Sequence, residues 1–339
     1  MRNLSMDALC EKIGNAVSKQ AISKYEKGES LPGSQILILL SQALDVKPDY
    51  FFRESQFAIS NIEFRKKAKM GVKEVDAIKE EIHDIIERYL EIEDVWGCVP
   101  YFANPVKGML VASDDDVCEV VKRLKEAWNI GEDGILSVTD LLESKNIKVV
   151  EIKADSSFDG LSGYVNNDEN MPFVVVNKSF DVERLRFTGL HELGHLVMNL
   201  PEEMEKKDKE RLCNLFASEM LISRDTFVDV LGERRSDISL QELKVLQAVY
   251  GISVDALMFK AKTVGVISES KYTSFCIRKN KSLAFKDAVE RSSYRGVEES
   301  SRFDRLVYRA LASDMISCSK AAVLLNEPME EVKNKLELV

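Results

Sequence analysis

Histidine is scarce in this chain of 339 residues, which contains only three, and its seven prolines and two tryptophans are also few. The six cysteines are scattered and form no Cys-x-x-Cys pair; they are Cys10, Cys98, Cys118, Cys213, Cys276 and Cys318. This scatter argues against a disulfide framework and against a thiolate zinc knuckle. We therefore expect reduced thiols that are mostly buried.

Long apolar runs are also missing. None approaches the roughly 20 residues needed to cross a bilayer, and the N-terminus lacks the charged-then-apolar pattern of a secretory signal. We therefore expect a cytoplasmic protein with no membrane partner. The formal net charge of -10 excludes a generic polyanion binder, so any contact with nucleic acid must be local.

The N-terminal region is patterned as short helices. Residues 18–26 predict a helix with Ser18 as its N-cap and with Ala21, Ile22 and Tyr25 on its inner face. Four polar side chains are left pointing outward: Lys19, Gln20, Ser23 and Lys24.

A long helix with a heptad seam is predicted next. Its apolar residues recur at alternating spacings of three and four, at Val75, Ile78, Ile82, Ile85, Tyr89, Ile92 and Trp96. Such a seam either pairs two chains in a homodimer or packs against another domain of the same chain, and the pattern leaves both open. Pro100, Pro105 and Gly108 then mark a boundary.

The remaining pattern mixes helices with two buried strands. Strands are predicted at 147–152 and 173–176. The helix predicted at 181–200 ends before Pro201. Further helices are predicted at 114–128, 138–145, 207–222, 240–250, 253–264 and 319–325. The chain is thus expected to be α+β and mostly helical.

Two of the three histidines lie in the segment His191-Glu-Leu-Gly-His195, within the helix predicted at 181–200. Positions four apart share one helix face, so both imidazoles can bind one ion. A hydrolytic zinc site uses three protein ligands and leaves the fourth position to water. Glu192, beside the first ligand, is suited to accept a proton from that water. The alternative is a structural pair of histidines satisfied within the core.

The third ligand must come from another segment. The only other histidine is His83, on the predicted solvent side of the long helix, so a carboxylate is preferred. Glu210 and Glu219 lie nine residues apart on the helix predicted at 207–222 and face nearly opposite sides. Asn214, four residues after Glu210, would support a ligand by a hydrogen bond. We predict Glu210 as the third ligand and keep Glu219 as the alternative.

Three segments together resemble the ImmA/IrrE metallo-endopeptidases. They are the run from Arg184 to His195, the preceding Val174-Val-Val-Asn177, and the following Glu210-Arg-Leu-Cys-Asn-Leu-Phe-Ala-Ser-Glu219. This joint match is more specific than the five-residue motif alone. Gly189, Leu190 and Ser223 depart from the family pattern without removing a chemical group.

The resemblance implies a zinc endopeptidase. In it His191, His195 and Glu210 bind Zn²⁺, and Glu192 is the general base. It also implies a protein substrate, because family members are associated with cleaving helix-turn-helix repressors in stress responses and mobile elements.

The N-terminal block resembles the XRE-type helix-turn-helix, through 4–14, 18–28 and Leu31-Pro32. The module is incomplete, since its usual first helix has no counterpart before Leu4 and residues 15–17 lengthen the turn. The resemblance implies DNA binding through the outward face of the helix at 18–26. Gln20 would read an adenine edge, Lys19 and Lys24 would meet phosphates, and Ser23 shares their face. A protein-docking piece, or a helical bundle without a partner, is the alternative.

Two features of substrate binding are less defined by the sequence. An edge strand beside the cleft would hold an extended peptide by backbone hydrogen bonds. Tyr164 is a candidate donor to the oxyanion of the transition state, with a packed aromatic as the other interpretation.

These inferences give four predicted units. They are a helix-turn-helix domain at 1–55, a helical linker at 56–98, a zincin-like peptidase domain with a small sheet at 99–235, and a C-terminal helical domain at 236–339. The predicted function is a zinc endopeptidase and transcriptional regulator that cleaves a helix-turn-helix repressor. The alternative is a DNA-binding or antitoxin-like regulator whose metal site is a sensor or a relic.

Overall fold

The computed structural model describes residues 4–44, 46, 48, 51, 59–60, 71–97, 101–166 and 168–336. Within these residues it contains sixteen helices and one four-stranded sheet, which confirms the predicted mostly helical α+β class. The five cysteines in the described part are free thiols, and Cys98 lies outside it. In the same part of the chain, no helix combines the length and apolar character needed to cross a bilayer.

The first three helices form a small bundle with its own core. They are α1 (Met6–Lys12), α2 (Lys19–Glu26) and α3 (Ser34–Leu44). The predicted cap is confirmed, because the Ser18 hydroxyl accepts a hydrogen bond from the backbone N–H of Ala21. The core comprises Leu9, Cys10, Ile13, Ile22, Leu40 and Ala43. The lengthened turn between α1 and α2 is accommodated by Gly14 and Asn15, which both have positive φ.

The sheet has the strand order β1-β3-β4-β2. Its strands are β1 (Ile59–Ser60), β2 (Lys148–Ile152), β3 (Gly160–Val165) and β4 (Pro172–Asn177). β2 and β4 run parallel, whereas β3 is antiparallel to both β4 and β1. The strands predicted at 147–152 and 173–176 correspond to β2 and β4.

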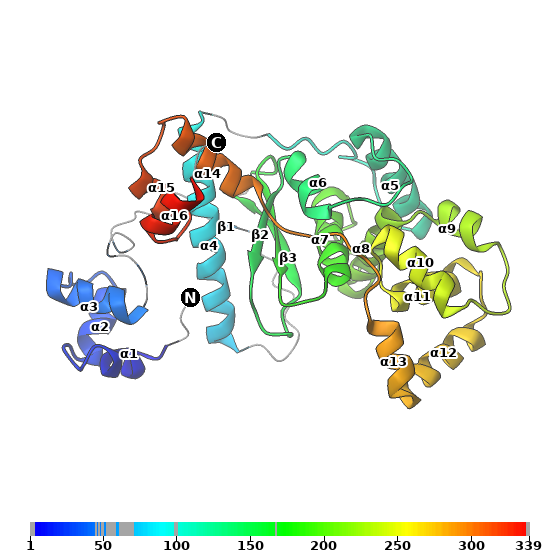
Figure 1. The fold of residues 1–339 in the computed structure, drawn as a ribbon, viewed down its shortest axis with the longest axis horizontal. Helices are drawn as coiled ribbons and strands as arrows, with labels where there is room; N and C mark the ends of the chain where they lie inside the picture. The colour runs from blue at the N-terminus through cyan, green and yellow to red at the C-terminus, as the bar shows by residue number, and fades with distance from the viewer. Residues whose placement is uncertain are drawn as a thin grey trace.

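The long helix α4 (Val72–Val95) covers one face of the sheet (Figure 1). Ile78, Ile82 and Ile86 pack with alternate residues of the three longer strands, including Leu161 and Val175. The seam residues Val75, Ile78, Ile82, Tyr89 and Ile92 are buried, while Ile85 and Trp96 are half-buried. Of the two alternatives for the seam, the structure therefore shows packing within the chain.

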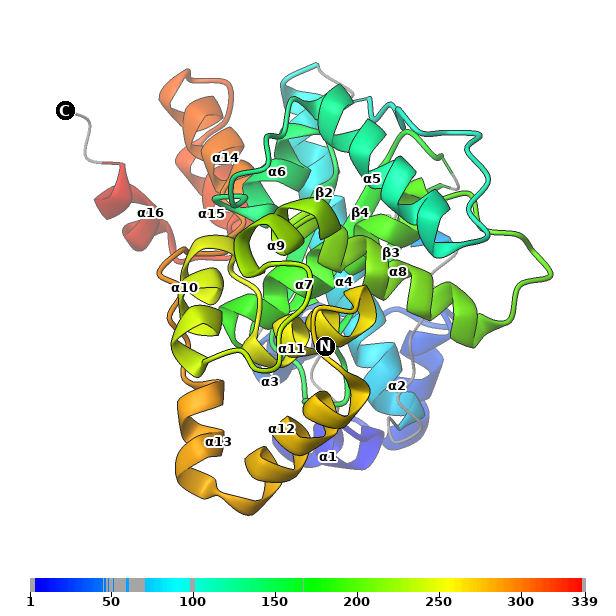
Figure 2. The same ribbon diagram turned by 90° about the vertical axis from the view of Figure 1, so that its right-hand side faces the viewer.

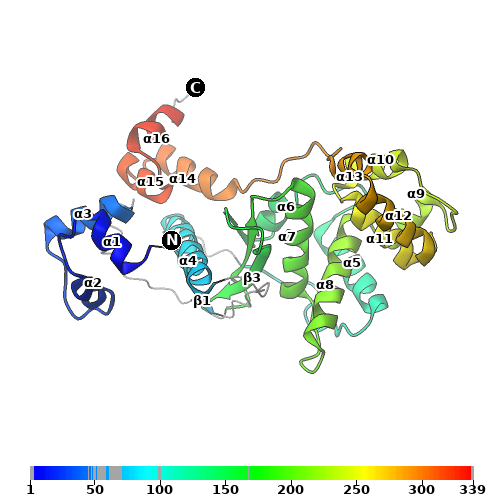
Figure 3. The same ribbon diagram turned by 90° about the horizontal axis from the view of Figure 1, so that it is seen from below.

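The other face of the sheet carries α7 (Val182–Val197), which packs on β3, β4 and the next long helix, α8 (Lys206–Leu221) (Figures 1 and 3). This core also includes residues of α5 (Asp114–Trp128) and α6 (Val138–Ser144). It continues through α9 (Arg224–Leu231), α10 (Leu240–Tyr250), α11 (Val254–Val264), α12 (Glu269–Lys281) and α13 (Leu283–Glu290) (Figure 2). The helices α10 to α13 thus share a core with α7.

The last three helices return to α4. They are α14 (Arg302–Ala312), α15 (Cys318–Leu324) and α16 (Met329–Lys335). Ile92 of α4 packs with their apolar residues, including Val307, Ala321 and Val332. A segment without helix or strand, residues 292–301, runs from the end of α13 to α14 and crosses the molecule beside α6 (Figure 1). We refer to residues 292–301 as the strap.

Candidate metal centre

His191 and His195 lie one turn apart on α7 and face α8. Their ring centroids are 5.1 Å apart, with an interplanar angle of 61°. The His191 side chain is only 3% exposed and that of His195 is 20% exposed. His191 therefore lies in the core, and His195 lies closer to solvent. Gly194 allows α8 to approach, because a Cβ there would lie 3.2 Å from a ring carbon of Phe216 and 3.3 Å from the Met198 methyl group.

Glu210 of α8 lies opposite the two imidazoles. One carboxylate oxygen is 3.6 Å from Nε2 of His191, and the other is 3.8 Å from Nε2 of His195. Both distances are too long for hydrogen bonds. They are close to the roughly 3.4 Å that separates donor atoms bound to one tetrahedral zinc ion at about 2.1 Å each. Two imidazole nitrogens and a carboxylate are donors that zinc prefers, so these residues fit the ion.

Glu219, the alternative ligand, faces a different part of the core. Its carboxylate forms a buried ion pair with Lys260 of α11, at 2.5 Å, and accepts a hydrogen bond from the backbone N–H of Arg224 at 2.7 Å. Burial lowers the pKa of Lys260, and the Glu219 carboxylate opposes that shift. Asn214 is exposed on α8. The structure therefore brings Glu210, but not Glu219, to the two histidines.

Glu192 is held from the side of the sheet. The Ser162 hydroxyl on β3 donates a hydrogen bond of 2.8 Å to one oxygen of the Glu192 carboxylate. Gly160 lets β3 approach α7 closely, because a Cβ there would lie only 2.6 Å from the methyl group of Thr188. The candidate base is thus fixed in place by a neighbour on the strand.

A cleft of about 290 Å³ opens between β3 and the C-terminal half of α7. Its lining includes Glu192 and His195, Ser162 to Tyr164 on β3, and Lys209 on α8. The Tyr164 hydroxyl donates to the backbone carbonyl of Leu196 at 3.0 Å, and burial raises the pKa of Tyr164 to about 12. Because its proton is committed to that carbonyl, Tyr164 serves here as a packed aromatic residue of the cleft wall.

The outer edge of β3 is partly covered by the chain itself. Ile59 pairs with Val165, and Ser60 pairs with Tyr164. Within the described residues, no strand pairs with that edge at Ser162 or Gly163. The stretch of β3 nearest Glu192 is therefore the part that lines the cleft.

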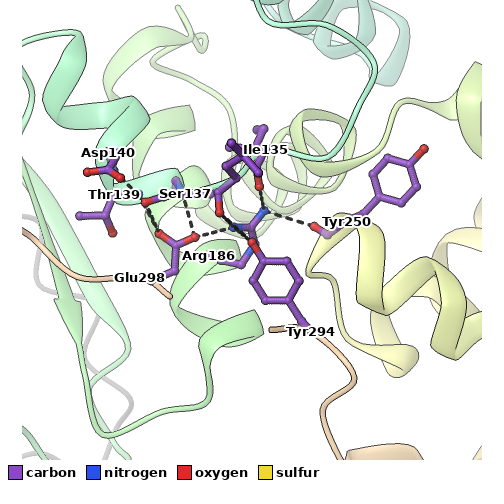
Figure 4. A network of polar contacts seen from close by, with 10 residues as sticks. Ile135, Ser137, Thr139, Asp140, Arg186, Tyr250, Tyr294 and Glu298 are labelled. Carbon is purple, nitrogen blue, oxygen red and sulfur yellow. Dashed lines mark hydrogen bonds and ion pairs between the residues drawn. The ribbon is translucent and has the colours of Figure 1, made fainter. Parts of the chain in front are cut away.

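A buried arginine fixes the start of α7 (Figure 4). Arg186 is 0% exposed and pairs with Glu298 of the strap at 2.5 Å. It also donates to the carbonyls of Ile135 and Tyr250 and to the Tyr294 hydroxyl. These contacts connect the helix that carries both histidines to the strap and to the end of α10.

Glu298 completes this network at the N-terminus of α6. Its carboxylate accepts hydrogen bonds from the backbone N–H groups of Val138 and Thr139, at 2.9 and 2.8 Å, and from the Ser137 hydroxyl at 3.2 Å. An acidic group at a helix N-terminus is also favoured by the helix dipole. One carboxylate of the strap therefore orders both α6 and α7.

Two groups near the site were missed from the sequence alone. Ser162 lies on β3, a strand for which no range was predicted. Cys213 lies on α8 with its sulfur close to both histidines, within a group of ligand atoms all less than 4.8 Å apart. Its spacing of three from Glu210 was the available signal, because such residues share a helix face.

Three of the four α2 residues predicted to point outward are exposed. Lys19, Gln20 and Lys24 are exposed, whereas Ser23 is half-buried. Lys19 forms an exposed ion pair of 2.6 Å with Asp7 of α1. Gln20 and Lys24 are thus the more accessible members of the predicted DNA-binding set.

Comparison with known proteins identifies both modules. A helix-turn-helix family model matches residues 1–51, and the model of the IrrE N-terminal-like domain, a peptidase family, matches residues 142–262. The chain is also 45% identical over 53 residues to the uncharacterized HTH-type transcriptional regulator y4aM of Sinorhizobium fredii. That match covers 16% of this chain and only 36% of the relative. The predicted fusion of a helix-turn-helix domain to an IrrE-like peptidase domain is thereby confirmed.

Proposed function

We propose that the chain is a cytoplasmic zinc endopeptidase that cleaves a helix-turn-helix repressor. The observation that carries this proposal is the position of Glu210, whose carboxylate spans the Nε2 atoms of His191 and His195 at 3.6 and 3.8 Å. Glu192 lines the adjoining cleft. The match of residues 142–262 to the IrrE-like peptidase model supports the same reaction class.

His191, His195 and Glu210 would hold the ion. When bound, zinc lowers the pKa of a water molecule at its open position and polarises the substrate carbonyl. Glu192 accepts the proton of the attacking water and later transfers a proton to the departing amine. Ser162 keeps the Glu192 carboxylate aimed at the cleft through its 2.8 Å hydrogen bond.

The substrate is an extended peptide segment in this proposal. The cleft wall includes Ser162 and Gly163 on the outer edge of β3, where backbone groups can pair with an added strand. Lys209 lines the same cleft and favours an acidic group in the substrate. A repressor with an exposed interhelical segment meets these requirements.

The proposed role of the helix-turn-helix domain is to localise the peptidase on DNA. The domain brings the peptidase to DNA, where a repressor of similar fold is bound, through Gln20 and Lys24 on the outward face of α2. Since the seam of α4 is buried within the chain, a homodimer on a two-fold DNA site would form through another surface.

A second candidate function is a DNA-binding or antitoxin-like regulator whose metal site is a sensor or a relic. It is favoured by the 45% identity of a 53-residue segment to an HTH-type transcriptional regulator. The retention of Glu192 favours the enzyme, because a purely structural metal site needs no general base.

The test is to incubate the zinc-loaded protein with helix-turn-helix repressors from the same genome and to identify products by mass spectrometry. We expect one repressor to be cut within a defined segment, and the chelator-treated protein to leave it intact. Intact repressors in both samples, with binding of the chain to its own promoter, would favour the regulator instead.

A further inference from the structure

Cys213 lies close to the two histidines of the candidate metal centre. Its Sγ, one ring nitrogen of His191 and one ring nitrogen of His195 all lie within 4.8 Å of one another. The Cys213 side chain is fully buried, at 0% exposed. It follows Glu210 by three residues on α8, so both side chains leave the helix toward α7.

The surroundings of Cys213 differ from those of an ordinary buried cysteine. A free cysteine usually behaves as a small apolar residue, and Cys10 does so among the aliphatic side chains of α1, α2 and α3. Cys213 also belongs to an apolar core, but its sulfur lies close to two imidazoles that face a carboxylate. A thiolate is a strong zinc ligand, with a bond of about 2.3 Å. A sulfur within 4.8 Å of a ring nitrogen of each histidine is close enough to join them as a ligand of one ion.

We propose that Cys213 is a fourth ligand of the metal held by His191, His195 and Glu210. This inference rests on the proposed zinc centre and adds a ligand to it. Four protein ligands give the closed tetrahedron of a structural site, whereas three leave the open position of a hydrolytic site. With zinc bound, the Cys213 thiolate would compete with water for the fourth position, and it would have to leave that position before water could enter.

The ligand assignment is tested on the full-length protein loaded with Co²⁺ alone, which reports thiolate coordination by absorption. Wild type should show an intense thiolate-to-cobalt charge-transfer band in the near ultraviolet. Cys213→Ala should lose this band but keep the weaker visible bands of bound Co²⁺. Competition with a chromophoric chelator should show a Zn²⁺ affinity at least about 10-fold lower in the variant, because removal of a group that only hydrogen-bonds to a ligand already costs about 10- to 100-fold.

Two further variants make the comparison specific. Cys10→Ala removes a buried thiol from the separate core of α1, α2 and α3, and it should retain both the band and the affinity. Cys213→Ser keeps the size of the side chain, so it reports the loss of sulfur if the alanine variant is poorly folded. Circular dichroism of the metal-free proteins checks the fold in each case.

A wild-type Co²⁺ protein without the charge-transfer band, or a band that persists in Cys213→Ala and Cys213→Ser, would overturn the assignment. Metal-saturated Cys213→Ala should hydrolyse substrate faster than wild type, because no thiolate then competes with water; an equal or lower rate would contradict that competition. Different results would contradict the proposed function itself: no binding of Co²⁺ at all, or cleavage by Glu192→Gln as fast as by wild type.

Discussion

Glu210 and Glu219 belong to the same helix but contact different partners. The Glu210 carboxylate lies 3.6 Å from Nε2 of His191, whereas the Glu219 carboxylate lies 2.5 Å from Nζ of Lys260. A separation of nine residues is two and a half helical turns, so the two side chains leave α8 on opposite sides. One acidic residue therefore lies beside the two histidines, and the other pairs with a lysine buried in the core.

Exchange of each glutamate for glutamine should affect a different property: Glu219→Gln the stability, and Glu210→Gln the Zn²⁺ affinity. Glu219→Gln leaves the buried Lys260 ammonium without its counter-charge, and we expect a loss of about 3 kcal/mol in the free energy of unfolding. Its Zn²⁺ affinity should stay close to that of wild type. Glu210→Gln should lose Zn²⁺ binding and change the stability of the metal-free protein by less than about 0.5 kcal/mol. Urea unfolding and chelator competition measure the two effects, and equal Zn²⁺ loss in both variants would contradict the ligand assignment.

Removal of the Glu298 carboxylate should destabilise the contacts that hold α6 and α7 to the strap. Glu298→Ala leaves the Arg186 guanidinium buried and unneutralised, and it removes the acceptor for the N-terminus of α6. We expect a cost of about 3 to 5 kcal/mol in the free energy of unfolding. Urea unfolding followed by tryptophan fluorescence reports this change. Glu299→Ala, at the exposed neighbouring position, is the matched control and should cost less than about 0.5 kcal/mol. Similar losses in both variants would exclude a specific role for the network.

Substitutions on α2 test DNA binding. Lys24→Ala should weaken binding to all sequences and reduce the slope of log affinity against log salt by about 1. Gln20→Ala should weaken binding mainly to the cognate site. Lys19→Ala should have a smaller effect than Lys24→Ala, because Lys19 is already paired with Asp7. Fluorescence anisotropy with a fragment of the chain's own promoter measures all three, and failure of wild type to bind would favour a protein-docking role.

The free energy of unfolding should decrease at alkaline pH because of the Cys118 thiol on α5. Burial, together with the nearby Glu219 carboxylate, raises the pKa of the Cys118 thiol from about 9 to about 11. The folded state therefore keeps a proton that the unfolded state releases, so the thiol's stabilising contribution is complete below pH 9 and is lost as pH rises through 11. Unfolding in urea at pH 8.5 and 10.5 should show a larger decrease for wild type than for Cys118→Ala. Equal decreases would mean that the thiol ionises alike in both states.

The sequence predicted α7 and the placement of its two histidines on one face because the information is local. The apolar spacing, the stop at Pro201 and the pair His191 and His195 all lie within some twenty residues. Position on one helix face then follows from helix geometry alone. The same reasoning separated Glu210 from Glu219, since their opposite orientation depends only on the helical repeat.

Other parts of the site depend on contacts that no local pattern encodes. Gly160 and Gly163 weaken the strand signal of β3, so the strand that supplies Ser162 had no predicted range. Arg186 and Glu298 are 112 residues apart in sequence, and the strap has no helical or strand periodicity to place it. The seam of α4 was compatible with a partner chain or with the sheet, and only the tertiary packing decides between them.

The central claim is that α7 and α8 hold a zinc ion beside Glu192 as the general base. Its most direct test measures zinc content and repressor cleavage in parallel for wild type and Glu192→Gln. We predict about one zinc per chain in both proteins and a cleavage rate at least about 100-fold lower in the variant, as expected when a general base is removed. Equal cleavage rates, or wild-type protein that retains no zinc, would contradict the account.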